Sequence, residues 1–246
     1  MTIRNGSLRW PVPDFLPEIL PGQMILGVSR RSKYLLFQLE KGTLIVHLGM
    51  TGHLRLVRAG DERRKHDHVE LCFNDGTCLC YNDSRRFGAI FWTGDDPLQH
   101  ERLSGLGPEP LGEEFTFEYL FQKSRNRSVA IKVFLMNASV VVGVGNIYAN
   151  EALFRAGISP QCEAGRVSRL RMETLVAVVR EILTEAIAAG GTTIRDFSNT
   201  EGKPGYFKQE LRVYGREGQP CVTCLEPIRQ IRLGQRSTYF CPKCQK

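Results

Sequence analysis

The sequence YLLFQLEKGTLIVHL (residues 34–48) contains two short apolar runs on either side of a Glu-Lys-Gly turn. Four similar runs follow it: HLRLV (53–57), VELCF (69–73), TCLCY (77–81) and GAIFW (88–92). Their apolar alternation, their β-branched and aromatic content and their regular spacing predict antiparallel strands. The NDG sequence at 74–76 is a typical hairpin turn. We therefore expect residues 1–95 to form a β-sandwich or a β-barrel, with Thr2–Arg4 already part of a strand.

The pattern changes to helices after the Pro/Gly-rich stretch GLGPEPLG (105–112). The best helix signal is SRLRMETLVAVVREILTEAIAAGG (168–191), where apolar residues repeat at helical spacing until two glycines end the run. The predicted core positions of this helix are Met172, Leu175, Val176, Val179, Ile182, Leu183 and Ala186. The fold class is therefore α+β, with a β domain (1–104), a helical domain (105–215) and a small finger (216–246).

The finger contains the pairs CVTC and CPKC, whose thiols are Cys221, Cys224, Cys241 and Cys244. Two such turns complete a tetrahedral zinc site with no open position, so the predicted cofactor is one structural Zn²⁺. A redox pair is the alternative, but redox motifs of this type come singly. The other four cysteines (72, 78, 80 and 162) lie in apolar surroundings and are expected to be reduced, buried small hydrophobes.

The chain carries a net charge of +7, and much of the excess lies near its end. Residues 201–246 hold nine basic residues against four Glu: Lys203, Lys208, Arg212, Arg216, Arg229, Arg232, Arg236, Lys243 and Lys246. Such clustering is typical of phosphate binding. Between the cysteine pairs, PIRQIRLGQRSTYF (227–240) alternates like a hairpin that could project Arg236 into a groove. The alternative is a solvated edge of the finger. With no apolar run of ~18 residues and no leader segment, we expect a cytoplasmic protein without membrane contact.

A glycine-containing segment, VVVGVGNIYANEALFRAGISP (140–160), leads into an amphipathic helix. It resembles a dinucleotide-binding fingerprint only in part, because Tyr148 stands where the third glycine belongs. A turn before a helix N-terminus, where backbone N–H groups and Asn146 hold a phosphate, is the better interpretation. We expect a second helix after Gly157, so that the segment forms a helix, a two-turn bend and a helix.

Two further segments place unusual side chains at turns between strands. HLGMTGHL (47–54) contains Met50, and YNDSRRFGAIFW (81–92) contains Arg85 and Phe87. A methionine in a strand is usually core and paired arginines are usually solvated, yet this set suits a protein that wedges open a base stack. His66 and His68 could form a metal pair, but a phosphate contact or a structural histidine is favoured because no further ligand completes the set.

The full set of motifs closely resembles bacterial formamidopyrimidine-DNA glycosylases of the Fpg/Nei family. The segments that carry the resemblance are RRSKYLL, HLGMTGHL, KHDHV, DSRRFGA, LGPEPL, VVGVGNIYANEALF, GGTTIRDF, GKPGYFKQELRVYGR and the finger, in one order from about residue 4 to the end. The resemblance implies a β-sandwich, a helix–two-turn–helix domain and a zinc finger. It also implies a monomeric, nucleoid-associated enzyme that excises 8-oxoguanine and formamidopyrimidines from double-stranded DNA and nicks abasic sites by β,δ-elimination.

The resemblance further implies roles for individual residues. Lys33 would assist proton transfer, and Arg236 would take part in δ-elimination while clamping a phosphate together with Asn146. His66, Arg127 and Lys132 would contact DNA phosphates. Met50, Arg85 and Phe87 would fill the void left by the everted nucleotide and face the orphaned cytosine. The Arg–Phe pair favours the oxidised-purine branch of the family.

The opening MTIRNG departs from the family, whose members begin Pro-Glu-Leu-Pro-Glu after removal of the initiator Met. That terminal proline attacks C1′ and forms a Schiff base, and the glutamate is its acid/base partner. Pro17 and Glu18 cannot replace them, because an internal proline nitrogen is an amide without a nucleophilic lone pair. The expectation is that the first helix and strand are missing here. Three functions follow as alternatives: a glycosylase/lyase whose start is absent from this sequence, a catalytically impaired binder of damaged DNA, or a generic zinc-finger regulator. The last explains the finger but not the Met-Arg-Phe set or Lys33.

Overall fold

The computed structural model describes residues 1–190 and 211–246. These residues form two compact units, one of residues 1–104 and the other of residues 105–190 and 211–246. The predicted helical and finger domains thus lie in one unit, and the boundary between them at 215 stays a prediction. The loop-rich stretch before the finger, with most of GGTTIRDF and part of GKPGYFKQELRVYGR, lies outside the described residues. Within the described ranges, no helix is long and apolar enough to cross a membrane.

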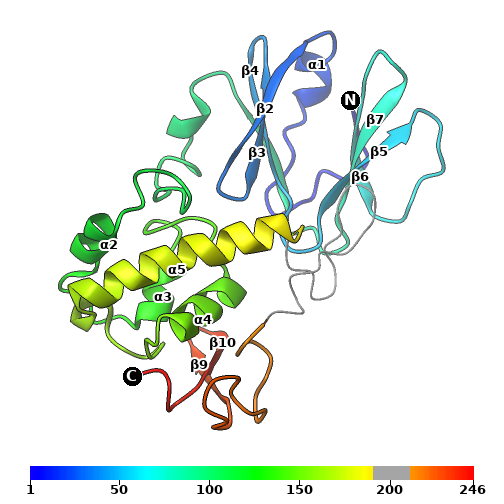
Figure 1. Ribbon diagram of the computed structural model, residues 1–246. Helices are drawn as coiled ribbons and strands as arrows, with labels where there is room; N and C mark the ends of the chain where they lie inside the picture. The colour runs from blue at the N-terminus through cyan, green and yellow to red at the C-terminus, as the bar shows by residue number, and fades with distance from the viewer. Residues whose placement is uncertain (191–210) are drawn as a thin grey trace. The chain divides into compact units, whose positions relative to one another are not determined.

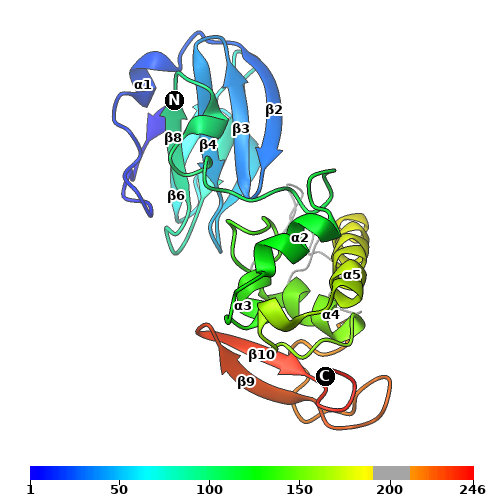
Figure 2. The ribbon, with the colours of Figure 1, turned by 90° about the vertical axis from the view of Figure 1, so that its left-hand side faces the viewer.

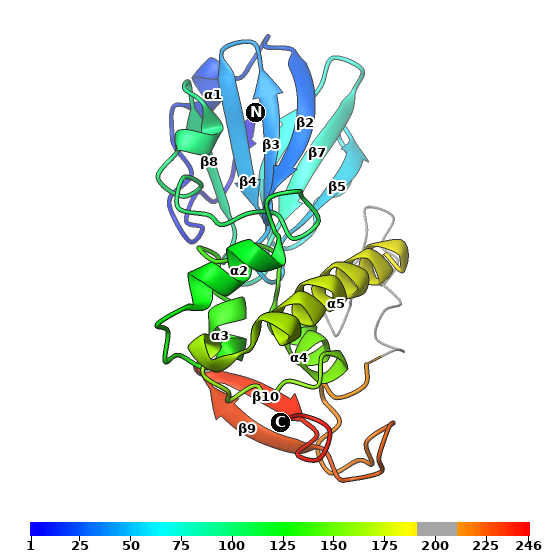
Figure 3. The ribbon, with the colours of Figure 1, turned by 60° about the vertical axis from the view of Figure 1, so that its left-hand side comes forward.

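The first unit is a sandwich of two four-stranded antiparallel sheets (Figures 1 and 3). One sheet has the order β1-β6-β7-β5, with bounds Thr2–Ile3, Asp67–Cys72, Thr77–Asn82 and His53–Arg58. The other has the order β2-β3-β4-β8, with bounds Ile25–Arg31, Tyr34–Leu39, Gly42–His47 and Ala89–Thr93. The short helices α1 (Leu16–Ile19) and η1 (Pro97–Gln99) complete the unit. The predicted β-sandwich is confirmed, and Ile3 pairs with Val69 as the strand assigned to the start of the chain requires.

The core of the sandwich comes from alternate residues of the paired strands. Phe37, Val46, Val69 and Tyr81 are at most 8% exposed and belong to one apolar cluster between the sheets. Alternation puts their neighbours on the outer faces. Leu16 of α1 is fully buried in the same cluster, so the helix packs onto the sandwich by its apolar side.

The hairpin β6–β7 turns at the NDG sequence, as predicted. Gly76 has a φ of +80°, and the Phe73 N–H donates to the Thr77 carbonyl at 2.8 Å. This short turn places Cys72 directly opposite Cys78, and the two form a disulfide. The expectation that both are reduced is therefore wrong. Cys78 is buried as expected, whereas Cys72 is exposed. The apolar residues around each cysteine in the sequence do not indicate the strand register that places the two thiols opposite each other.

The second unit is built around the helix α5 (Arg169–Ala188), which packs against α2 (Phe117–Ser124) and α4 (Asn146–Arg155). All seven predicted core positions of α5 are buried. Its N-cap is Ser168, whose hydroxyl accepts a hydrogen bond from the backbone N–H of residue 171. The sequence pattern therefore predicts both the start and the buried face of this helix.

The helix–two-turn–helix arrangement lies earlier in the chain than predicted. No helix begins directly after Gly157; only the short η2 (Ala164–Arg166) precedes α5. The helix before the bend is α3 (Ile131–Leu135), which is five residues long. Two turns follow α3, with N–H donation from Asn137 to Phe134 and from Val140 to Asn137. A helix this short spans little more than one turn, so its apolar residues cannot show helical periodicity.

The finger contains the predicted hairpin, β9 (Arg229–Leu233) paired with β10 (Arg236–Phe240), between its two cysteine pairs (Figure 2). Gly234 and Gln235 form the two-residue turn, and both have positive φ, as a type I′ turn requires. An added Cβ on Gly234 would lie 3.0 Å from the Val133 side chain, so the turn packs closely on α3. The hairpin is thereby attached to the helical part of the unit, with Arg236 exposed beside its turn.

Candidate nucleic-acid interface

Five of the predicted site residues lie at one end of the sandwich. Lys33 is in the β2–β3 turn, Met50 in the β4–β5 turn, His66 directly before β6, and Arg85 and Phe87 in the β7–β8 turn. The cross-strand pairs Tyr34↔His47, His53↔Asn82 and His47↔Ala89 bring these turns to the same edge. The antiparallel topology therefore gathers residues that are up to 54 positions apart in the sequence (87 minus 33).

Met50, Arg85 and Phe87 form one exposed cluster. The Arg85 Nη1 lies 3.8 Å from the Met50 Sδ, and the Arg85 guanidinium lies 4.5 Å from the centre of the Phe87 ring. Met50 is 58% exposed and Phe87 is 44% exposed. Two large apolar side chains held in water on either side of a cation form a surface that can enter a base stack. We call this set the wedge cluster.

Asp83 lies beneath the wedge cluster and is fully buried. Burial alone would raise the pKa of its carboxyl group. Hydrogen bonds from the Thr51 hydroxyl, the Gly88 N–H and the Tyr81 hydroxyl together outweigh burial and lower the pKa below its usual value. The carboxylate is therefore ionised at neutral pH. The sequence pattern does not single out Asp83, because an Asp before an arginine pair is normally an exposed turn residue.

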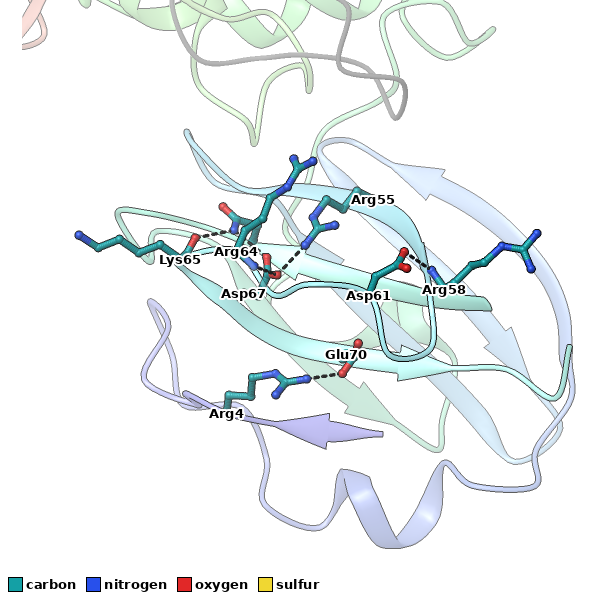
Figure 4. Close-up of polar contacts among 9 residues, drawn as sticks. Arg4, Arg55, Arg58, Asp61, Arg64, Lys65, Asp67 and Glu70 are labelled. Atoms are coloured by element: carbon teal, nitrogen blue, oxygen red, sulfur yellow. Dashed lines mark hydrogen bonds and ion pairs between the residues drawn. The ribbon is translucent and has the colours of Figure 1, made fainter. Parts of the chain in front are cut away.

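The loop that carries His66 is held by Asp67 and Asn82. The Asp67 carboxylate accepts hydrogen bonds from the Arg55 guanidinium at 2.6 Å and from the Arg64 N–H at 2.9 Å (Figure 4). The Asn82 amide donates to the Lys65 carbonyl at 2.9 Å and to Asp67 at 2.7 Å. His66 itself adopts a φ of +74°, an uncommon backbone conformation for a residue with a side chain. These contacts fix the loop that carries the half-buried His66 at the edge of the sandwich.

Lys33 is exposed in its turn, close to His47. Burial lowers the pKa of His47, and the positive charges of Lys33 and Arg9 lower it further. The imidazole is therefore neutral at physiological pH and adds no positive charge to this edge.

The remaining predicted contacts lie in the second unit. A groove of about 610 Å³ is lined by Lys123, Arg127 and Arg236, together with Val133, Asn137 and Ser139. Arg127 and Arg236 are both exposed. Arginine side chains in a groove of this kind can bind phosphate oxygens with paired hydrogen bonds. The structure thus brings together two predicted phosphate contacts from distant parts of the chain.

Lys132 and Asn146 both donate to the Ser237 carbonyl, at 2.9 and 3.1 Å. The Lys132 ammonium also donates to the Thr238 hydroxyl at 2.6 Å, and the side chain is only 1% exposed. Burial, followed by the charge of Arg236, lowers the pKa of Lys132 to about 8. The phosphate contact of Lys132 stays a prediction, because in this conformation its amine holds the strand that begins at Arg236. Asn146 is the first residue of α4 and is half-buried.

Two further polar residues of α4, Asn150 and Glu151, are buried and contact the chain around the finger. The Glu151 carboxylate accepts the backbone N–H groups of residues 212, 213 and 214 at 2.8–3.0 Å. The Asn150 side-chain oxygen accepts the Tyr239 N–H at 2.7 Å. No sequence signal pointed to them, because polar residues in an amphipathic helix are normally assigned to its solvated face.

The four cysteines of the finger are arranged to bind one tetrahedral metal ion. Cys221 and Cys244 have a sulfur–sulfur distance of 3.9 Å, and Cys224 and Cys241 one of 3.4 Å. All four sulfur atoms lie within 4.8 Å of one another. Zn–S bonds of about 2.3 Å in a tetrahedron require a sulfur–sulfur spacing of about 3.8 Å. The residues therefore fit a zinc ion whose coordination shell is complete without water or substrate.

Comparisons with known proteins agree with this geometry. Three family models match: the formamidopyrimidine-DNA glycosylase N-terminal domain (1–90), its H2TH domain (106–198) and the zinc finger found in FPG and IleRS (218–246). The formamidopyrimidine-DNA glycosylase of Methylococcus capsulatus is 54% identical over 244 residues, which cover 99% of this chain and 90% of that protein.

Solved structures give the same result. Lactococcus lactis Fpg in complex with abasic-site DNA matches with a TM-score of 0.87 at 37% identity, over 94% of this chain and 85% of that chain. The same protein in complex with DNA containing Fapy-dG matches with a TM-score of 0.85 at 36% identity and the same coverage.

Proposed function

The chain belongs to the formamidopyrimidine-DNA glycosylase family, and we propose that it removes oxidised purines from duplex DNA and cleaves the strand at the abasic site. The substrates are 8-oxoguanine and formamidopyrimidines, and strand cleavage is by β,δ-elimination. A curated relative that is 54% identical over nearly the whole chain carries the name of this activity, which favours it over a non-catalytic binder of damaged DNA.

The observation that carries the proposal is the wedge cluster. A base can react with an enzyme's active site only after it leaves the stack, which costs a few kcal/mol. Met50 and Phe87 supply the apolar surface that replaces it, and Arg85 between them supplies donors for the orphaned cytosine. Nothing in a generic zinc-finger regulator requires exposed apolar side chains at this place.

The other site residues receive roles that match their positions. His66, Arg127, Asn146 and Arg236 contact DNA phosphates, and Arg236 also assists the δ-elimination step. Lys33 assists proton transfer at the damaged nucleoside. During the reaction an amine bonds to C1′ while the glycosidic bond breaks and the base leaves. The C1′–O4′ bond then breaks and O4′ takes up a proton, which gives the Schiff base. The Schiff base permits the two eliminations that release the flanking phosphates.

The zinc finger holds one structural Zn²⁺ on Cys221, Cys224, Cys241 and Cys244. Its part in the function is to place the hairpin β9–β10, and with it Arg236, while the ion supplies no chemistry to the reacting atoms. We further propose that the protein acts as a monomer on the DNA of the bacterial nucleoid, since one duplex is the only partner that these roles require.

Borohydride trapping tests the proposed function. The protein is isolated as its own cells produce it and incubated with a duplex that contains 8-oxoguanine opposite cytosine. We expect a covalent protein–DNA adduct with borohydride and a nicked strand without it, because the reduced Schiff base cannot dissociate. Mass spectrometry of the adduct then identifies the attacking amine. Tight binding without an adduct or a nick would instead favour the non-catalytic binder.

A further inference from the structure

Asp83 joins the two turns that carry the wedge cluster. One carboxylate oxygen accepts the Thr51 hydroxyl at 2.5 Å and lies 3.3 Å from the Arg85 N–H. The other accepts the Gly88 N–H at 2.9 Å and the Tyr81 hydroxyl at 3.1 Å. Thr51 follows Met50 in the β4–β5 turn, whereas the backbone donors belong to the β7–β8 turn. One buried carboxylate therefore connects the β4–β5 turn, which carries Met50, to the β7–β8 turn, which carries Arg85 and Phe87.

The backbone of Asp83 also contacts the third functional turn. Its N–H donates to the His66 carbonyl at 3.2 Å, and its carbonyl accepts from the His68 Nε2 at 2.8 Å. The proposed phosphate contact and the wedge cluster are thus linked through one residue.

Glycines allow the two turns to touch directly. A Cβ on Gly49, where φ is +68°, would lie 2.6 Å from the backbone of Phe87 and Gly88. A Cβ on Gly88 would lie 1.7 Å from the Tyr81 hydroxyl oxygen. The backbones are therefore in contact above Asp83, with no room for side chains between them.

We propose that Asp83 is a positioning residue that holds the Met50 turn and the Arg85–Phe87 turn together, so that the wedge cluster enters DNA as one preformed unit. This inference rests on the proposed function and deepens it. Mobile side chains would lose conformational entropy when they become ordered on binding, and this loss would weaken insertion. A preformed cluster is already ordered and avoids that loss. The buried carboxylate supplies the order, because a charge without its donors is strongly unfavourable in the interior.

Holding the two turns together affects recognition of the opposite base as well as the rate of wedge insertion. Arg85 donates its backbone N–H toward the Asp83 carboxylate while its side chain lies between Met50 and Phe87. If the two turns separate, the guanidinium loses its fixed position relative to the orphaned base. Discrimination between cytosine and adenine opposite the lesion then falls together with the rate of insertion.

Thr51→Val tests the proposal, because it removes the hydroxyl donor of the Met50 turn and preserves side-chain shape. Wedge insertion is followed by stopped-flow fluorescence of 2-aminopurine beside 8-oxoguanine, and discrimination by single-turnover excision opposite cytosine and opposite adenine. We expect insertion to slow about tenfold and the cytosine preference to fall by a similar factor, since one hydrogen bond to a charged group is lost. Thr51→Ser, which retains the hydroxyl, should restore both values.

Asp75→Asn is the matched control, because Asp75 accepts hydrogen bonds from Thr77 in the distant β6–β7 turn. It should leave insertion and discrimination unchanged. Asp83→Asn should show a larger defect than Thr51→Val, with thermal unfolding recorded to confirm that each variant is folded. Wild-type insertion and discrimination in folded Thr51→Val would overturn the positioning role. Failure of the wild type itself to excise 8-oxoguanine would overturn the proposed function instead.

Discussion

Asp83, Lys132 and Glu151 are ionisable side chains that the fold keeps away from water. Each is satisfied by backbone or hydroxyl groups from another part of the chain. A buried charge is tolerated only when such partners are in place, so each of these residues fixes where two segments meet. Lys132 and Glu151 do this for the finger, and Asp83 does it for the wedge cluster.

The lowered pKa of Lys132 predicts a pH dependence of stability. The folded protein releases this proton near pH 8, whereas the unfolded chain retains it up to about 10.5. Between these values the unfolded state binds more protons, so the free energy of unfolding contributed by Lys132 increases as pH rises. We expect the wild type to gain stability relative to Lys132→Met over this range, measured by urea unfolding with zinc present. Parallel curves for the two proteins would contradict the burial of a charged amine.

Individual residues could be predicted only where their type is unusual for their place. The four cysteines and the Met-Arg-Phe set are recognisable because their chemistry has few other uses at such positions. Asp83 and Glu151 could not be recognised, since an Asp in a turn and a Glu in a helix are ordinary surface residues. Their burial results from contacts between segments far apart in the chain, such as Glu151 with residues 212–214.

At the scale of elements, the strands and the long helix α5 were predictable and the short helix α3 was not. The predicted strand runs 34–39 and 77–81 correspond to β3 and β7, because alternation over five or six residues is a strong signal. α3 is too short for such a signal, and its place is set by burial of Ile131, Phe134 and Leu135 in the core of the second unit. The Cys72–Cys78 disulfide likewise depends on register.

The finger is the element whose stability should depend on metal. Its apolar core in the described residues is small: Phe154, Val213, Cys221, Ile228 and Cys241. Zinc therefore supplies much of its folding free energy. We expect a chelator, or Cys221→Ser, to expose the 216–246 segment to proteases and to lower DNA affinity at least about tenfold, because Arg236 loses its place.

Cys162→Ser is the control for this experiment, since Cys162 lies outside the finger and its thiol makes a weak contact with the Glu163 carbonyl at 3.5 Å. It should retain zinc and DNA affinity. A protease-resistant finger after complete zinc removal would show that the backbone hydrogen bonds accepted by Asn150 and Glu151 suffice to fold it.

For the molecule as a whole, the proposed contacts divide into charged and neutral groups. Arg127 and Arg236 carry full charges, whereas the proposed phosphate contact of Asn146 is through a neutral donor. Each charge that neutralises a phosphate releases counterions and adds about −0.9 to the slope of log affinity against log salt. The slope of this salt dependence therefore measures the number of charged phosphate contacts, whereas the affinity at one salt concentration includes the neutral contacts as well.

We expect the affinity for lesion-containing duplex to fall steeply with salt for the wild type. Arg127→Ala and Arg236→Ala should each reduce the slope by about 0.9, because each removes one charged contact. Asn146→Ala should lower affinity equally at every salt concentration and leave the slope unchanged. Arg166→Ala is the control, because Arg166 is exposed and paired with Glu163 outside the groove. An equal slope change for Arg166→Ala would show that the charge of the whole unit, and not the groove residues, binds DNA.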